Sequence, residues 1–126
     1  MCIRDSCYKA CEKKLAGESL EWDQRKSLGV VMAAKGYPHK YEKNNEIRNI
    51  PEESDEFKVF HAGTKLKDGS LKTNGGRVLC VTALGDSVQS AQAKVYSEIE
   101  NILWDDGFFR RDIGYRAIDR EQNESS

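Results

Sequence analysis

The sequence predicts an α+β fold in which mostly antiparallel strands are accompanied by one long helix. Continuous apolar runs rich in β-branched residues at 28–34, 57–62 and 77–84 favour strands. Apolar residues recur at helical spacing over 87–103, which predicts a helix. The Asp68-Gly69 dipeptide adds a tight turn of the kind that joins antiparallel neighbours. Several antiparallel strands with one helix laid across them make an α+β arrangement.

The first and last of these runs are the most apolar. Leu28–Ala34 is bounded by Lys26 and by Gly36-Tyr37-Pro38, and it suits a strand that is buried on both faces. Arg77–Leu84 predicts another buried strand, which ends at Gly85. Cys80 lies in the middle of that run, so we expect it in the core.

The segment between these two strands changes character along its length. Residues 39–56 are dense in charge and predict a solvated connection, with a short extended piece at 47–50. Residues 57–62 combine β-branched and aromatic side chains, which favours a strand. Residues 65–72 predict a hairpin, because Asp68-Gly69 readily adopts the positive φ angles of its turn.

The helix is expected from Ser87 to Leu103. Asp86 or Ser87 can cap its first turn, and Asp105-Asp106-Gly107 terminates it. Residues 108–118 then predict a final strand with a loop, and 123–126 predict a frayed polar tail. The apolar face of the helix consists of Val88, Ala91, Val95, Ile99 and Ile102.

The first twenty residues are predicted to lie outside the domain. We interpret residues 1–6 as a non-native leader, because they show no periodicity and join no recognisable pattern. Residues 7–20 are interpreted as the tail of an upstream helix and a connection, since Cys7, Cys11 and Leu15 recur at helical spacing. The four cysteines do not suggest a disulfide framework, so we expect reduced thiols.

Composition excludes several functional classes. The 126 residues contain 20 Lys and Arg against 21 Asp and Glu, a formal charge of -1, which argues against a generally basic nucleic-acid binder. The longest apolar stretches, 28–34 and 78–84, are far shorter than the ~20 residues that span a bilayer. Since no signal peptide is recognisable, we expect one soluble, cytoplasmic domain without membrane or nucleic-acid partners.

The strongest candidate site segment is Asn74-Gly75-Gly76-Arg77. Two adjacent glycines let the backbone approach a ligand closely and turn its N–H groups toward an anion. Arg77 offers a planar set of donors that suits a carboxylate or a phosphate. The alternative is a plain loop ahead of a strand, with a solvated arginine.

A second candidate lies at the end of the 57–62 strand. His61, Gly63 and Thr64 place an imidazole, a flexible glycine and a hydroxyl where ligand sites are often built. A purely structural histidine is the alternative. No Cys and His spacing matches a zinc site and no phosphate-binding P-loop is present, so we expect no metal site in this chain.

A basic cluster near the C-terminus is the third candidate. Arg110, Arg111 and Arg116 lie beside several aromatic residues, a combination that can hold a nucleotide or a phosphorylated sugar. The alternative is that Arg111 and Asp112 pair with neighbouring side chains.

Taken in order, the segments are more specific than each one alone. They are Ser27–Ala34, Gly36-Tyr37-Pro38, Lys58–Lys65, Thr73–Gly85 and Arg110–Ala117. Over roughly residues 21–122, this succession closely resembles the C-terminal domain of the phosphoribosylamine-glycine ligases, also called glycinamide ribonucleotide synthetases. The loop that carries Lys35 and His39 departs from the family pattern, in which small residues are common.

The resemblance implies membership of the ATP-grasp superfamily and a role in de novo purine biosynthesis. In that family, ATP phosphorylates the carboxylate of glycine, and the amine of phosphoribosylamine attacks the glycyl phosphate to give glycinamide ribonucleotide. ATP and Mg (or Mn) would be bound mainly by upstream domains that this chain lacks and on which it would pack. The chain alone is therefore expected to be inactive. The implied fold resembles a rudimentary single hybrid motif of the barrel-sandwich kind.

The resemblance also bears on the candidate residues. It implies no catalytic or metal-binding residue within this chain. A stand-alone binding or interaction module that kept the fold without the chemistry is the alternative interpretation. The residues expected to contact glycine or the sugar phosphate are Asn74, Gly75, Gly76 and Arg77, followed by His61, Gly63 and Thr64.

Overall fold

The computed structural model describes residues 3–124, so the first two residues of the predicted leader and the last two of the predicted tail lie outside the described residues. Within this range the α+β class and the antiparallel pairing are confirmed. The elements in chain order are α1 (Ile3–Cys11), β1 (Lys26–Ala34), β2 (Glu46–Ile47), β3 (Phe57–His61), β4 (Thr64–Lys67), β5 (Ser70–Thr73), β6 (Arg77–Gly85), α2 (Val88–Asn101), β7 (Gly107–Phe108) and α3 (Tyr115–Glu124).

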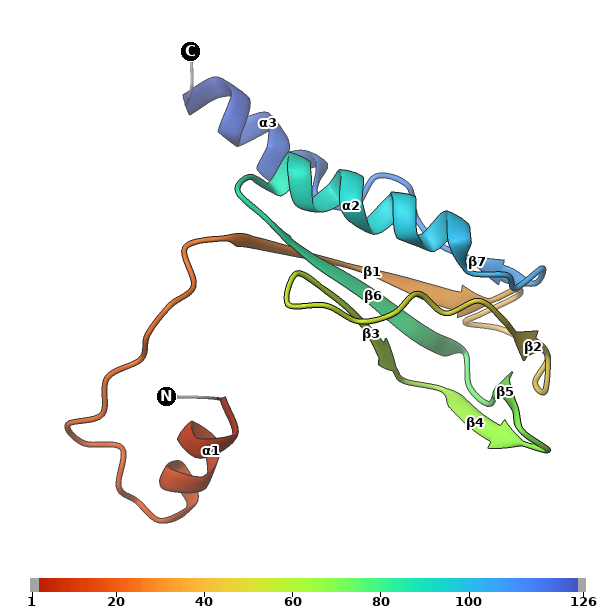
Figure 1. Ribbon diagram of the computed structural model, residues 1–126, viewed down its shortest axis with the longest axis horizontal. Helices are drawn as coiled ribbons and strands as arrows, with labels where there is room; N and C mark the ends of the chain where they lie inside the picture. Colours follow the sequence, from red (N-terminus) through yellow and green to blue (C-terminus); the bar gives the residue numbers. More distant parts are fainter. Residues whose placement is uncertain (1–2, 125–126) are drawn as a thin grey trace.

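The larger sheet has the strand order β3-β6-β1-β7, and the smaller one has the order β2-β5-β4 (Figure 1). In the larger sheet, β1 pairs antiparallel with β6 from Lys26 opposite Gly85 to Met32 opposite Leu79. The predicted hairpin is confirmed as β4 and β5. Asp68 and Gly69 have φ angles of 52° and 76°, as the dipeptide requires in such a turn.

Helix α2 lies along one face of the larger sheet and closes the core (Figure 1). The predicted cap is present, because the Ser87 side chain accepts a hydrogen bond from Ser90 N at 3.0 Å and Ser90 Oγ accepts one from Ser87 N. The core side chains from β1, β3, β6 and α2 include Val30, Met32, Val59, Val81, Ala91, Val95 and Ile99.

The opposite face of the sheet corrects two predictions. Strand β1 is buried on both faces only over its last three residues, Met32–Ala34; before them Val30 is fully buried whereas Val31 is 43% exposed. Cys80, which we expected in the core, is only partly buried and pairs with Val31 on this open face. Both predictions were wrong for one reason: within residues 3–124, a helix packs on only one side of β1 and β6.

The segment after α2 corrects another prediction. The strand expected over 108–118 is limited to β7, and α3 occupies 115–124, including two residues of the predicted frayed tail. Gly114 turns the chain with a φ angle of 88°. The side chain of Ile113 packs against the core, and Glu121 accepts a hydrogen bond from Val88 N at 2.9 Å. Tertiary contacts therefore bring α3 to the start of α2.

Residues 3–25 stand apart from the sheets (Figure 1). Helix α1 includes part of the predicted leader and buries none of its residues. The connection after it exposes several large apolar side chains, among them Leu15, Leu20 and Trp22, the last at 77%. No helix within residues 3–124 has the length and apolar character needed to cross a membrane.

Candidate functional site

Three loops meet at one end of the larger sheet. Backbone hydrogen bonds join them: Asn74 N donates to Gly63 O at 2.7 Å, and Ala34 N donates to Gly76 O at 2.8 Å. The end of β3 and the loop before β6, which the sequence singled out separately, are thus brought together. The turn that follows β1 and carries Tyr37 lies against the same loop. We refer to Tyr37, Gly63, Gly75 and Gly76 as the glycine junction.

Close packing between loops of the chain explains why glycine occupies these positions of the junction. A Cβ atom on Gly63 would lie 2.5 Å from Arg77 O and 3.0 Å from Gly75 Cα. A Cβ atom on Gly76 would overlap the ring of Tyr37. The space beside Gly63 and Gly76 is therefore filled by neighbouring loops, and not by a ligand as predicted from the glycine pair. The glycines allow the loops to pack closely and hold the backbone around Arg77.

The side chains beside the junction face solvent. Asn74, Arg77 and His61 are exposed, and Thr64 is partly buried. Among residues 3–124, the Arg77 guanidinium has no hydrogen-bond or ion-pair partner. His61 Nδ1 lies 3.0 Å from Thr64 Oγ1, so the imidazole and the hydroxyl are hydrogen-bonded. The two joined loops thus carry an unpaired guanidinium, a side-chain amide and a hydrogen-bonded imidazole and hydroxyl, groups that suit a carboxylate or phosphate.

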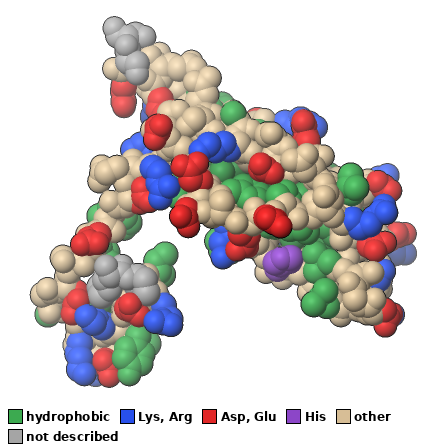
Figure 2. Space-filling view, in the orientation of Figure 1, with side chains coloured by type: hydrophobic (Ala, Val, Ile, Leu, Met, Phe, Trp, Pro, Cys, Tyr) green, Lys and Arg blue, Asp and Glu red, His purple; other side chains and the backbone are tan. Residues whose placement is uncertain are grey.

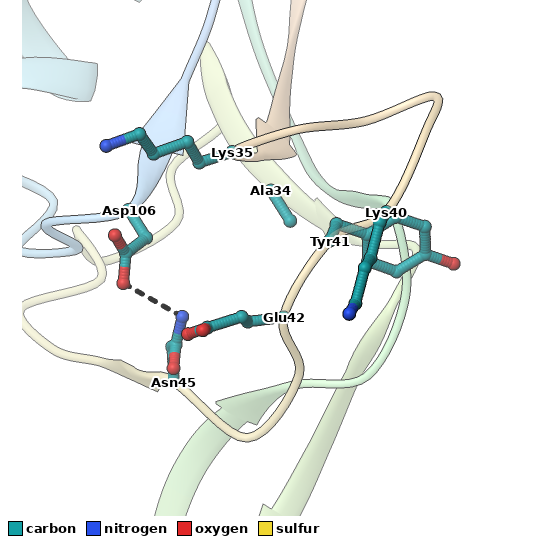
Figure 3. Close-up of a pocket in the computed structure, with 7 residues that line it drawn as sticks. All are labelled: Ala34, Lys35, Lys40, Tyr41, Glu42, Asn45 and Asp106. Carbon is teal, nitrogen blue, oxygen red and sulfur yellow. Dashed lines mark hydrogen bonds between the residues drawn. The ribbon is translucent and has the colours of Figure 1, made fainter.

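A cavity of about 380 Å³ lies next to the junction. Figure 3 shows it between the end of β1, the loop that carries Lys40 and Glu42, and the turn at Asp106. Asn45 Nδ2 donates to Asp106 Oδ2 at 2.9 Å across the cavity. The backbone of Asn45 is also bonded to Thr73, the residue before the Asn74–Arg77 loop. Backbone hydrogen bonds of Ala34 and Asn45 therefore connect the cavity wall to the junction, although no junction residue lines the cavity.

The C-terminal basic cluster fits its structural alternative. Arg110 donates to both carboxylate oxygens of Asp112, at 2.9 and 2.6 Å, and this hydrogen-bonded pairing lowers the pKa of Asp112. Arg111 lies over the ring of Phe109 and 3.9 Å from Glu100. Arg110 and Arg111 thus interact with side chains of the same chain. Figure 2 shows Lys and Arg side chains interspersed with Asp and Glu over the visible face, without a broad basic region.

Comparison with known proteins identifies the domain. The family model described as "Phosphoribosylglycinamide synthetase, C domain" matches residues 27–116. The chain belongs to this family. The phosphoribosylamine-glycine ligase of Escherichia coli K12 is 58% identical over 119 residues, which is 93% of this chain and 28% of the relative. That of Salmonella typhimurium is 54% identical over 121 residues, or 94% of this chain and 28% of the relative.

A solved structure agrees with the synthetase C-domain assignment. The crystal structure of the phosphoribosylamine-glycine ligase from Thermotoga maritima matches with a TM-score of 0.69 and 34% identity. The match covers 87% of this chain and 28% of that one. The chain thus spans just over a quarter of the length of these relatives, and the predicted resemblance to the ligase C-terminal domain is confirmed.

Two features of the candidate site could not be predicted from the sequence. The wall formed by Asn45 and Asp106 joins residues 61 positions apart, and no local pattern signals such a contact. Tyr37 belongs to the Gly36-Tyr37-Pro38 segment of the family resemblance, but its contact with the loop before β6 was not predicted. The neighbouring glycine pair was the available signal, because glycines often occur where another group approaches the backbone closely.

Proposed function

We propose that this chain is the C-terminal domain of a ligase that joins glycine to 5-phosphoribosylamine with ATP, giving glycinamide ribonucleotide, ADP and phosphate in de novo purine biosynthesis. The 58% identity to a phosphoribosylamine-glycine ligase over 93% of the chain carries the proposal. The same identity disfavours a stand-alone interaction module. The near-neutral charge of the chain argues against a nucleic-acid partner, and we place the enzyme in the cytoplasm without a membrane partner.

The proposed chemistry requires cations beside a carboxylate and a phosphate. A carboxylate reacts poorly with an amine until one oxygen becomes a phosphate leaving group, and positive groups must neutralise the charge of the reacting centre. We assign Arg77 and Asn74 to contact with the glycine carboxylate or the sugar phosphate, because both are exposed and Arg77 is unpaired among residues 3–124. We place His61 and Thr64 in the same site as second candidates, because the end of β3 is hydrogen-bonded to the loop that carries Asn74.

The residues of this chain do not fit the metal. When bound, Mg²⁺ (or Mn²⁺) neutralises charge on the ATP phosphates. Within residues 3–124, no three His, Cys, Asp or Glu side chains gather into a group that could hold it. We therefore assign ATP and the metal to the part of the enzyme that this chain does not span.

The open face of the larger sheet supports packing on the rest of the enzyme. Val31, Phe60 and Phe108 are 43%, 48% and 43% exposed there. Val31, Cys80 and Phe60 form one row across β1, β6 and β3. Covering such side chains removes apolar surface from water, at roughly 25 cal/mol per Å². The relatives have nearly three-quarters of their length outside the match, enough chain to supply that cover.

Replacing Arg77 in the full-length ligase tests the proposal. Arg77→Ala should lower kcat/KM about 10- to 100-fold, the equivalent of one lost hydrogen bond to a charged group. The melting temperature should stay unchanged, because the side chain is exposed. Arg120→Ala, at another exposed arginine on α3, is the matched control and should retain wild-type kinetics. Wild-type kinetics in the Arg77 variant would remove this residue from the site.

A further inference from the structure

The ring of Tyr37 packs against Gly76. A Cβ atom added to Gly76 would meet Cδ2, Cε2 and Cγ of this ring before any other group. Gly76 is itself buried, although it belongs to a loop whose neighbours Asn74 and Arg77 are exposed. The aromatic ring therefore covers one side of this loop.

Backbone hydrogen bonds make this contact part of a clamp. Tyr37 N donates to Ala34 O at 3.0 Å, and Ala34 N donates to Gly76 O at 2.8 Å. On the far side of the loop, Asn74 N donates to Gly63 O at 2.7 Å. The loop is therefore held between the turn after β1 and the end of β3. Tyr37 adds a side-chain contact to these backbone hydrogen bonds.

We propose that Tyr37 is a positioning residue, which fixes the Arg77 backbone so that its free guanidinium projects toward substrate; this inference rests on the proposed function. A guanidinium binds a carboxylate or phosphate through two parallel hydrogen bonds, so its alignment matters. Displacement of such a group by about 1 Å can cost on the order of 100-fold in rate. The ring carries this role, because the Tyr37 hydroxyl has no hydrogen-bond partner within residues 3–124.

Four variants of the full-length ligase test the inference: Tyr37→Phe, Tyr37→Leu, Arg77→Ala and the double variant Tyr37→Leu/Arg77→Ala. Tyr37→Phe keeps the ring and should retain kcat/KM within about twofold. Tyr37→Leu should lower kcat/KM about 10-fold and raise the KM of the same substrate that Arg77→Ala affects. Because Tyr37 acts through Arg77, the double variant should be no worse than Arg77→Ala alone.

The outcomes separate the inference from the proposed function. If Arg77→Ala is impaired and Tyr37→Leu is not, or if the two losses multiply in the double variant, the positioning role is overturned and the proposed function stands. If Arg77→Ala itself behaves as wild type, the role of Arg77 falls and the inference falls with it. Tyr115→Leu, at an exposed tyrosine on α3, controls for the substitution itself.

A second variant and a second measurement guard against misfolding. If Tyr37→Leu does not fold, Tyr37→Met takes its place, since it keeps apolar volume without a planar ring. In NMR spectra of the 126-residue chain, the α-protons of Gly76 should show a ring-current shift that Tyr37→Phe keeps and Tyr37→Leu or Tyr37→Met loses. Unshifted Gly76 protons in the wild-type chain would overturn the inference without reference to activity.

Discussion

The two faces of the larger sheet use the same strands in different ways. On one face, Val30, Val59 and Val81 are at most 2% exposed beneath α2. On the other face, the adjacent residues Val31 and Phe60 are 43% and 48% exposed. Side chains alternate along a strand, so one sequence run supplies both faces. The difference shows that an apolar run predicts which strand surfaces favour burial, but not which element of the chain or of a partner buries them.

The largest effect is expected beneath α2. Ile99 is 2% exposed and lies on the helix face that meets the sheet, four residues after Val95. Ile99→Ala should destabilise the 126-residue chain by about 2–5 kcal/mol, through lost burial and the cavity left behind. Urea unfolding followed by circular dichroism measures the change. A loss below about 1 kcal/mol would contradict a close-packed α2 face.

A matched pair of valines compares the two faces directly. Val30 and Val31 are consecutive residues of β1, at 0% and 43% exposure. Val30→Ala should cost roughly 2–3 kcal/mol, from lost transfer free energy and a cavity. Val31→Ala should cost about 0.5 kcal/mol or less, as at other exposed positions. Both values come from urea unfolding of the 126-residue chain. Equal losses would show that something within the chain covers the open face.

This comparison also explains how far the sequence could predict the fold. The runs at 28–34, 57–62 and 77–84, the Asp68-Gly69 hairpin and the capped helix were recognisable, because each depends on local periodicity or turn chemistry. The burial of Cys80 and of one face of β1 up to Val31 was mispredicted, since a continuous apolar run does not show how many layers of structure pack on a strand. Residues 108–118 were mispredicted because their conformation depends on contacts of Ile113 with the core.

The candidate site was predictable in part for the same reason. Two separate glycine segments could be selected by their residue types, and the structure brings them together at Gly63 and Gly75. Which atoms fill the space beside each glycine could not be predicted. Tyr37 reaches Gly76 across 39 positions of sequence, a distance over which no residue spacing is informative. The role of Arg77 remains a proposal that kinetics can test.

The smallest expected effect is an ion pair that ties α2 to the chain entering β3. Lys94 Nζ donates to Glu56 Oε2 at 2.6 Å, and this hydrogen bond is the main cause that lowers the pKa of Glu56 below its usual 4.5. A carboxyl group with a lowered pKa in the folded state stabilises the fold above its unfolded pKa. That contribution is lost as the pH falls through the lower, folded value.

Lys94→Ala should therefore reduce the loss of stability between about pH 5 and pH 3, measured as urea midpoints at each pH. The effect should be small and should shrink further in 0.5 M NaCl, since both side chains are exposed and salt screens such pairs. Lys58→Ala, which breaks the pair with Glu53 beside the open face, is the matched control. If the urea midpoints of Lys94→Ala fell with decreasing pH as steeply as those of the wild type, this contact would not help to hold α2 against the sheet. Packing beneath the helix would then account for the whole difference between the two faces.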